Sequence, residues 1–189
     1  MTEYAPATLE CIAAPATDED ITAVHDAVGV DLPVDLVAWW RRANGSIPGP
    51  RRRGYDLLPH FSPCSIEHAL RSREIWWQVW HDQNLDQGWL TEEDFTWAQA
   101  RPAGTRVGMW LRSFLPIATS SGGLDLFVDL RPGAEHGCVR EFDRVGTDGR
   151  PRWAGVAAML ADIAQTLENQ GPIDGLRPQL TDDDPLYWD

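Results

Sequence analysis

Two aspartates, Asp125 and Asp129, are the carboxylates whose type and spacing could provide an acid and a base. They lie four residues apart among alternating apolar residues, so on a strand both side chains point to the same face. A strand rises about 3.3 Å per residue, which separates them by about 13 Å, whereas paired catalytic carboxylates lie about 5–10 Å apart. We therefore expect Asp125 and Asp129 to cap turns or lie at the surface.

A second candidate for chemistry is the H-x3-C-x3-H spacing of His60, Cys64 and His68. Imidazole and thiolate groups are ordinary metal ligands, and the chain turns between them at Pro63 and Ser65. A fourth ligand and groups to orient the two histidines are not evident in the sequence. We expect packing or surface histidines here and predict no metal site.

The other patterns typical of catalysis are not present in the sequence. The run from Ser120 to Gly123 joins two predicted strands rather than a strand and a helix, and no G-x-S-x-G pattern surrounds it. The chain also has no glycine-rich motif of the kind that binds phosphate. We predict no catalytic residue, no cofactor and no enzyme activity.

Tryptophan is abundant, with ten residues. Trp89, Trp97 and Trp188 lie in acidic segments without helical core periodicity, and exposed tryptophan is enriched among the residues that dominate interface energies. These three are therefore candidates for contact with a partner. Five others fall at the helical spacing of a core, namely Trp39, Trp40, Trp76, Trp77 and Trp80.

The acidic segment 82–97 is the candidate surface for that partner. It holds five carboxylates and two tryptophans and no basic residue, so the acids would steer a basic protein while the indoles anchor it. The alternative is that both indoles fold back over Ile75 and Val79, which lie off the apolar arc of their helix. The candidate binding residues are Asp86, Trp89, Glu92, Glu93, Asp94 and Trp97.

The net charge of −13 limits the kinds of partner. All basic residues are arginines, and their one concentrated run comprises Arg41, Arg42 and residues 51–53. A nucleic-acid-binding protein needs a broader basic footprint, so we expect no nucleic acid and favour a basic protein. The alternative is that the excess acid only keeps the protein soluble.

The cysteines and the N-terminal residues indicate the compartment. Three cysteines far apart in sequence do not suggest a disulfide framework. Glu3 and Glu10 stand where a signal peptide would have basic residues, and no stretch reaches the ~18–20 apolar residues of a membrane span. We expect a soluble cytoplasmic protein without membrane association.

The elements that position these residues start from a predicted hairpin over 113–130. Leu124, Leu126 and Val128 form an aliphatic face, while acids and aromatic residues occupy the other face. Ser120 to Gly123 supply the turn, and Pro116 indicates an edge or a bulge. Further strands are expected over 55–58, 105–111 and 138–142, with a turn at 148–149.

Capping residues and apolar periodicity predict helices around this hairpin. The expected fold class is α+β, with an antiparallel-rich central sheet covered by N-terminal, long central and C-terminal helices. Residues 1–16 are expected to be extended. The predicted helices cover 18–27, 33–43, 65–84 and 154–169, with a helical turn from Thr91.

Three motifs, and the order in which they occur along the chain, resemble the SUKH superfamily. The hairpin matches its pattern of an aromatic residue, a proline, a Ser/Gly turn and Leu-x-Leu-x-x-Asp-Leu. Leu32-Pro33 followed by Asn44-Gly45 is similar to its N-terminal helix, and Gly137-Cys138-Val139 before the last helix to its closing strand. The resemblance implies one domain over 1–171, with a core at about 18–169, an insertion at 85–103 and an acidic tail at 172–189.

The superfamily includes fungal regulators of cell-wall assembly and bacterial immunity proteins. What the resemblance implies is a non-catalytic protein that holds a cognate toxin, expected to be nuclease-like. One alternative is a regulatory scaffold without a toxin partner. Another is a hydrolase whose site assembles from distant residues, with His60, His68 and Asp125 as its candidates.

Overall fold

The central hairpin forms as the sequence predicts. In the computed structural model, which describes residues 6–47, 57–143, 145, 147–179 and 186–189, β2 (Phe114–Thr119) and β3 (Leu124–Asp129) pair antiparallel. Gly123 adopts a φ of 83°, which an L side chain rarely allows, and its N–H donates to the carbonyl of Ser120 at 3.3 Å. The Ser/Gly run therefore makes the turn between the two strands.

Pro116 lies beside a bulge in this hairpin, as expected. The register shifts between Pro116 and Ala118, which leaves Ile117 out of the ladder with β3. The carbonyl of Ile117 instead accepts a hydrogen bond of 2.9 Å from Cys64. The bulge thus ties the hairpin to the segment that precedes the longest helix.

The hairpin is the centre of a five-stranded antiparallel sheet in the order β1-β2-β3-β4-β5. The predicted strand at 138–142 is confirmed by β4, whereas β5 stands where a turn was expected at 148–149. Two further strands form a separate two-stranded sheet. The remaining strands are β1 (Ser62–Pro63), β4 (Val139–Asp143), β5 (Thr147–Asp148), β6 (Pro178–Gln179) and β7 (Tyr187–Trp188).

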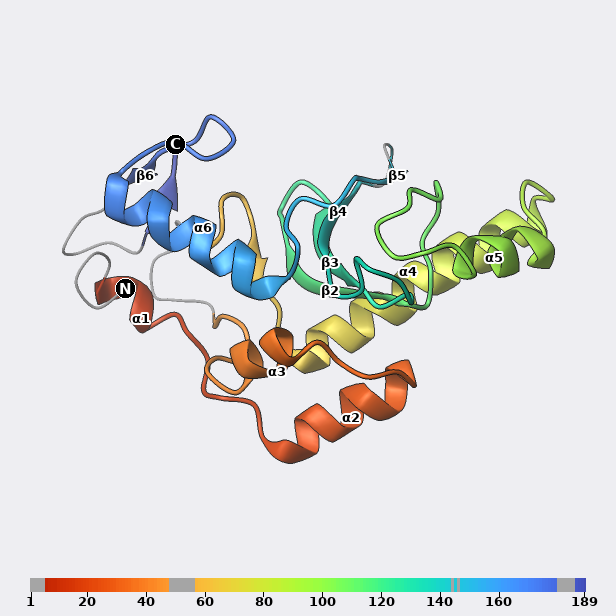
Figure 1. Ribbon diagram of the computed structural model, residues 1–189, viewed down its shortest axis with the longest axis horizontal. Coiled ribbons are helices and arrows are strands. Elements are labelled where there is room, and N and C mark those ends of the chain that lie inside the picture. The colour runs from red at the N-terminus through yellow and green to blue at the C-terminus, as the bar shows by residue number, and fades with distance from the viewer. Residues whose placement is uncertain (1–5, 48–56, 144, 146, 180–185) are drawn as a thin grey trace.

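The predicted helices are also present, and their ends lie within a few residues of the expected positions. Thr17 and Thr91 each form a capping box, with Asp20 and Asp94 respectively, and Ser65 caps the longest helix. The short α1 replaces part of the expected extended lead-in. The helices are α1 (Pro6–Leu9), α2 (Asp18–Val28), α3 (Val34–Trp40), α4 (Ile66–Asp86), α5 (Glu92–Gln99) and α6 (Val156–Asn169) (Figure 1).

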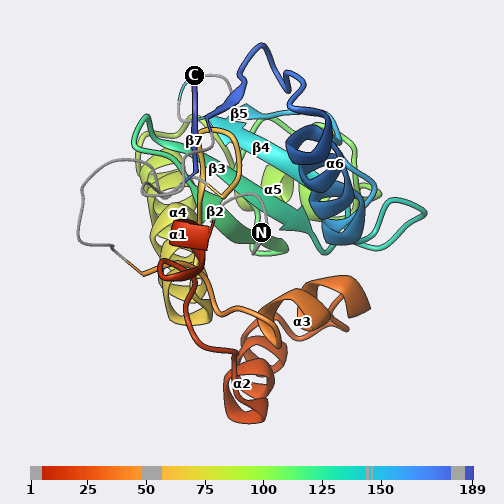
Figure 2. The same cartoon turned by 90° about the vertical axis from the view of Figure 1, so that its left-hand side faces the viewer.

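Both faces of the sheet are buried, and Figure 2 shows the sheet between α4 and α6. On the aliphatic face, Leu126 and Val128 share a core cluster with Ile163 of α6, and Leu160 packs against it while partly exposed. The aliphatic face of the hairpin therefore packs on α6. The aromatic face has its own cluster, which includes Trp76, Phe95, Trp110, Phe114, Phe127 and Phe142.

The C-terminal segment is part of the fold. Leu186 is fully buried and Trp188 is 9% exposed in the same cluster as the aliphatic face. The N–H of Leu186 donates to Thr8 Oγ1 at 2.7 Å, which fastens this segment to α1. The expectation that Trp188 offers a partner contact is therefore wrong, because its indole is packed inside.

The strand predicted at 105–111 does not form. The N–H groups of Val107 and Gly108 donate to the carboxylate of Asp148 instead of to a strand, and Gly108 adopts a φ of 74°. The strand predicted at 55–58 falls mainly outside the described residues; Leu58 makes a single bridge to Phe61. The observed fold is α+β, as predicted.

Candidate partner-binding site

The outer side of α4 carries two exposed aliphatic side chains. Trp76 lies inward at 8% exposure, whereas Ile75 is 52% and Val79 is 37% exposed. The helix α5 does not cover them, because it packs through Phe95 and Ala98 against the aromatic cluster. Ile75 and Val79 therefore remain available at the surface of the described structure.

Trp89 and Trp97 both lie outside the core. Trp89 follows Gly88, whose φ of 67° turns the chain after α4. Trp89 is 74% exposed. Trp97 is 56% exposed on the side of α5 away from Phe95, and the guanidinium of Arg101 lies 5.1 Å from its ring centroid. The interpretation in which both indoles form a satellite core over Ile75 and Val79 is wrong.

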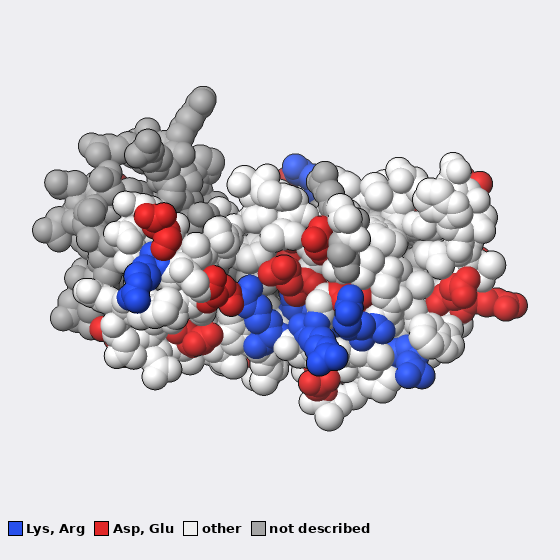
Figure 3. All heavy atoms as spheres, turned by 90° about the horizontal axis from the view of Figure 1, so that it is seen from above, with Lys and Arg blue, Asp and Glu red and all other residues white. Residues whose placement is uncertain are grey.

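The four candidate carboxylates are all exposed and lie at the same end of the molecule as these tryptophans. They belong to the end of α4 and the first turn of α5. Figure 3 shows acidic side chains gathered at the right-hand end, where Figure 1 places α5. The structure thus brings together at one end the predicted residues Asp86, Trp89, Glu92, Glu93, Asp94 and Trp97.

His81 fastens α4 to the start of α5. Its Nδ1 lies 2.9 Å from a carboxylate oxygen of Asp82 and its Nε2 lies 3.1 Å from one of Glu92, while the ring stacks on Trp77. Burial lowers the pKa of His81, but the hydrogen bonds and charges of Asp82 and Glu92 outweigh it and raise the pKa. The acidic end is therefore held together in part by a titratable contact.

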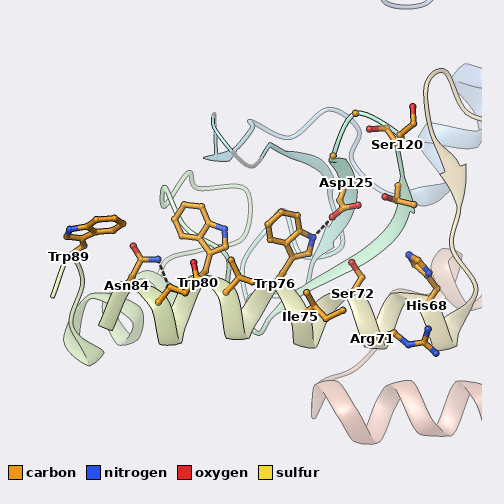
Figure 4. Close-up of a pocket in the computed structure, with 16 residues that line it drawn as sticks. His68, Arg71, Ser72, Ile75, Trp76, Trp80, Asn84, Trp89, Ser120 and Asp125 are labelled. Atoms are coloured by element: carbon orange, nitrogen blue, oxygen red, sulfur yellow. Dashed lines mark hydrogen bonds between the residues drawn. The ribbon is translucent and has the colours of Figure 1, made fainter. Parts of the chain in front are cut away.

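A groove of about 780 Å³ runs between α4 and the β2–β3 turn. Figure 4 shows the indoles of Trp76, Trp80 and Trp89 on the groove side of α4, with Ser120 on the opposite wall. Ile75 and Val79 also line it, together with residues 120–123 of the Ser/Gly turn. The sequence had identified the exposed aliphatic pair, but not the wall that completes a groove.

Asp125 is a buried groove residue rather than a surface or turn-capping one. It is 4% exposed, and its carboxylate accepts a hydrogen bond from the indole N–H of Trp76 (Figure 4). This contact explains why an acid occurs on the aromatic face of β3: its carboxylate satisfies the N–H donor of a tryptophan that packs against the sheet. The expectation that Asp125 lies at the surface or caps a turn is therefore wrong.

Asp129 is fully buried as well, in a network of charges. Its carboxylate accepts hydrogen bonds from Arg131 at 2.6 Å, from Arg140 at 2.7 Å and from the N–H of Gly104 at 2.9 Å. Burial alone raises the pKa of Asp129, but the hydrogen bond and charge of Arg131, with Gly104 and Arg140, hold it below its usual value. The expected surface position is therefore wrong for Asp129 too, although its hydrogen bond from Gly104 does secure the loop after α5.

The same network attaches the acidic end to the sheet. Arg131 also donates to the carbonyl of Ala98 at the end of α5 and to that of Thr105, while Arg140 reaches Asp148. Buried charges are tolerated when they are paired and hydrogen-bonded. Sequence reasoning missed this set, because its members are spread over β3, β4, β5 and two loops with no shared motif.

The residues of the hydrolase alternative do not form one constellation among the described residues. His68 and Asp125 both line the groove, whereas His60 lies exposed before β1 and is not among the lining residues. Cys64, which stands between the two histidines, is buried, and burial raises the pKa of its thiol to about 12. Within the described ranges, no three His, Cys, Asp or Glu side chains are grouped so as to hold a metal ion.

The arrangement defines an α+β protein with a surface groove beside an exposed aromatic and acidic end. The model of the SMI1/KNR4 family (SUKH-1) matches residues 15–162. This match covers most of the chain, and the protein belongs to that family. No curated protein matches the chain. In the described part of the chain, no helix has the length and apolar character needed to cross a bilayer.

Proposed function

We propose that this protein is a non-catalytic cytoplasmic immunity protein that binds a cognate toxin through the end formed by α4 and α5. The observation that carries the proposal is Trp89, a large apolar side chain that is 74% exposed beside carboxylates. A stable monomer gains little from exposing an indole, whereas tryptophan is among the residues that contribute most to binding energy at interfaces. Membership of the SUKH-1 family is consistent with this role.

The charge of the protein supports a basic toxin. The chain carries a net charge of −13, and the proposed site concentrates exposed carboxylates from α4 and α5. A nuclease needs positive charge to hold phosphates, so an acidic protein can be attracted to the same surface and cover it. The expected toxin is therefore a nuclease-like one whose substrate-binding face is basic.

Protection in living cells tests this function. This function predicts that a neighbouring gene encodes a toxin domain; that domain is expressed in a bacterial host with and without the protein, and growth is recorded. We expect growth to be restored by the wild-type chain, and less by a variant in which Trp89 and Trp97 are both alanine. A toxin inactivated at its own catalytic centre is the control for expression. Undiminished toxicity in the presence of abundant folded protein would contradict the proposal and favour a regulatory scaffold without a toxin partner.

A further inference from the structure

The surface tryptophans of this protein differ in whether an arginine guanidinium lies over the indole ring. Five of the ten are partly or largely exposed, and three of those have a guanidinium over the indole. Arg112 lies 4.7 Å from the ring centroid of Trp77, and Arg152 lies 4.3 Å from that of Trp153. Arg101 covers Trp97 in the same way. The protein thus repeatedly pairs exposed indoles with arginine, a favourable cation–π contact.

The other two surface tryptophans, Trp80 and Trp89, have no arginine over their rings in the described part of the chain. Both line the groove between α4 and the β2–β3 turn. Trp80 makes an edge-to-face contact with Phe142, with ring centroids 5.6 Å apart. Figure 4 shows the indoles of Trp80 and Trp89 on the same side of α4. The indole faces without a cation therefore coincide with the groove.

Ile75 and Val79, at the edge of the groove, begin a row along α4 that passes from aliphatic to acidic residues. Ile75, Val79, Asp82 and Asp86 follow one another at intervals of four, three and four residues, which places them in one row along the helix. All four are exposed, and Trp89 lies just beyond Asp86. Arg71, the arginine among the groove-lining residues, already pairs with Glu67. The row therefore offers apolar contact at one end and negative charge at the other.

We propose that this groove receives an arginine-bearing apolar segment of the basic protein partner. The guanidinium lies over the indole of Trp80 or Trp89 and is attracted by the carboxylates at the end of the α4 row, and the flanking apolar side chains cover Ile75 and Val79. Arginine suits the site better than lysine, since its planar guanidinium stacks on indoles and pairs with carboxylates at the same time. The inference rests on the proposed function for the nature of the partner and adds which side chain enters the groove.

A second copy of this chain is a poorer occupant on electrostatic grounds. Each copy carries a net charge of −13, and the α4 row that begins with the groove residues Ile75 and Val79 ends in the exposed carboxylates of Asp82 and Asp86. Two such surfaces repel each other at moderate salt, whereas a basic segment is attracted. Charge complementarity therefore selects the basic partner protein over self-association.

The test uses the full chain and two blocked pentapeptides. One has the sequence Leu-Arg-Leu-Arg-Leu, and the other has citrulline in place of both arginines, which keeps the shape of the side chain but removes its charge. Binding is followed by NMR through the indole N–H signals, assigned with single tryptophan variants. Tyr187→Ala is the control for Trp89→Ala, because both are exposed aromatic residues and only Trp89 lines the groove.

We expect the arginine peptide to bind about tenfold more tightly than the citrulline peptide and to shift the signals of Trp80 and Trp89. Trp89→Ala should weaken binding of the arginine peptide about tenfold, and Tyr187→Ala should leave its affinity within about twofold. Equal binding of both peptides, a loss for Trp89→Ala no greater than that for Tyr187→Ala, or a homodimer in sedimentation that excludes the peptide would each overturn the inference.

The outcomes separate this inference from the proposed function. If the peptides show no preference while the cognate toxin is still neutralised, the groove assignment fails and the immunity function stands. If the arginine peptide binds selectively at Trp89 while no neighbouring toxin is neutralised, the groove assignment stands and the immunity function fails. The peptide measurement needs no toxin, so the two results are obtained independently.

Discussion

Arg140 and Asp129 form an ion pair that is wholly enclosed in the protein. Nη1 of Arg140 donates to Oδ2 of Asp129 at 2.7 Å, and neither side chain has any solvent-exposed area. Arg131 pairs with the same carboxylate, and Arg140 extends the pairing to Asp148. These contacts join β3, β4 and β5 to the loop after α5, so they fix the position of the proposed binding end relative to the sheet.

Asp129→Asn should strongly destabilise the protein. The amide cannot compensate two buried guanidinium groups, and the loss of one partner from a buried pair costs about 3–5 kcal/mol. The free energy of unfolding from urea titration measures this change. Asp26→Asn, at an exposed aspartate of α2, is the matched control and should change stability by less than about 0.5 kcal/mol. Equal stability of both variants would contradict the structural role of the network.

The His81 contact predicts a pH dependence of stability. The pKa of His81 is raised in the folded state by Asp82 and Glu92, so its stabilisation is fully present below the unfolded pKa of about 6.5. That contribution is lost as the pH rises through the folded-state pKa. His81→Gln should therefore destabilise the protein more at pH 5.5 than at pH 9, measured by urea unfolding at both values. An identical loss at the two pH values would show that the histidine contributes only packing.

The packing of α6 on the sheet predicts unequal costs for two neighbouring substitutions. Ile163 is 3% exposed in the aliphatic cluster, so Ile163→Ala should cost about 2–5 kcal/mol. Leu160 is only partly buried at the margin of the same cluster, and Leu160→Ala should cost less. Chemical denaturation of both variants tests the order. A larger loss for Leu160→Ala would mean that α6 presents a different side to the sheet.

Two aromatic residues of α5 should respond in opposite ways to truncation. Trp97 is 56% exposed whereas Phe95 is 4% exposed in the aromatic cluster. Trp97→Ala should leave the free energy of unfolding within about 0.5 kcal/mol, and Phe95→Ala should lower it by about 3–5 kcal/mol. Thermal and urea unfolding give these values. A severe loss of stability in Trp97→Ala would mean that the indole of Trp97 packs in the core and does not belong to the proposed binding surface.

The fold was largely predictable because local signals and burial agreed. The alternation of Leu124, Leu126 and Val128 fixed the inner face of β3, and the stripe of α6 matched it. Caps at Thr17 and Ser65 placed two helix starts. These signals act over a few residues, so a single sequence reveals them.

The errors concern residues whose environment is set by distant parts of the chain. The carboxylates of Asp125 and Asp129 were predicted at the surface, because nothing local shows that Trp76 and Arg140 supply their partners. Residues 105–111 were predicted as a strand, but the N–H groups of Val107 and Gly108 donate to the carboxylate of Asp148 rather than to a neighbouring strand. Exposure of Trp89 was predicted from composition, but the groove beside it requires the approach of the hairpin turn to α4.

Calorimetric titration of the purified chain with the toxin domain that the proposed function predicts in a neighbouring gene tests the central claim most directly. The account predicts a tight complex with the wild-type protein, and a complex at least ~30-fold weaker when Trp89 and Trp97 are both replaced by alanine, since residues of this type dominate interface energies. The double variant should keep the wild-type melting temperature. Wild-type affinity in the double variant, or no complex with the wild-type chain, would contradict the account.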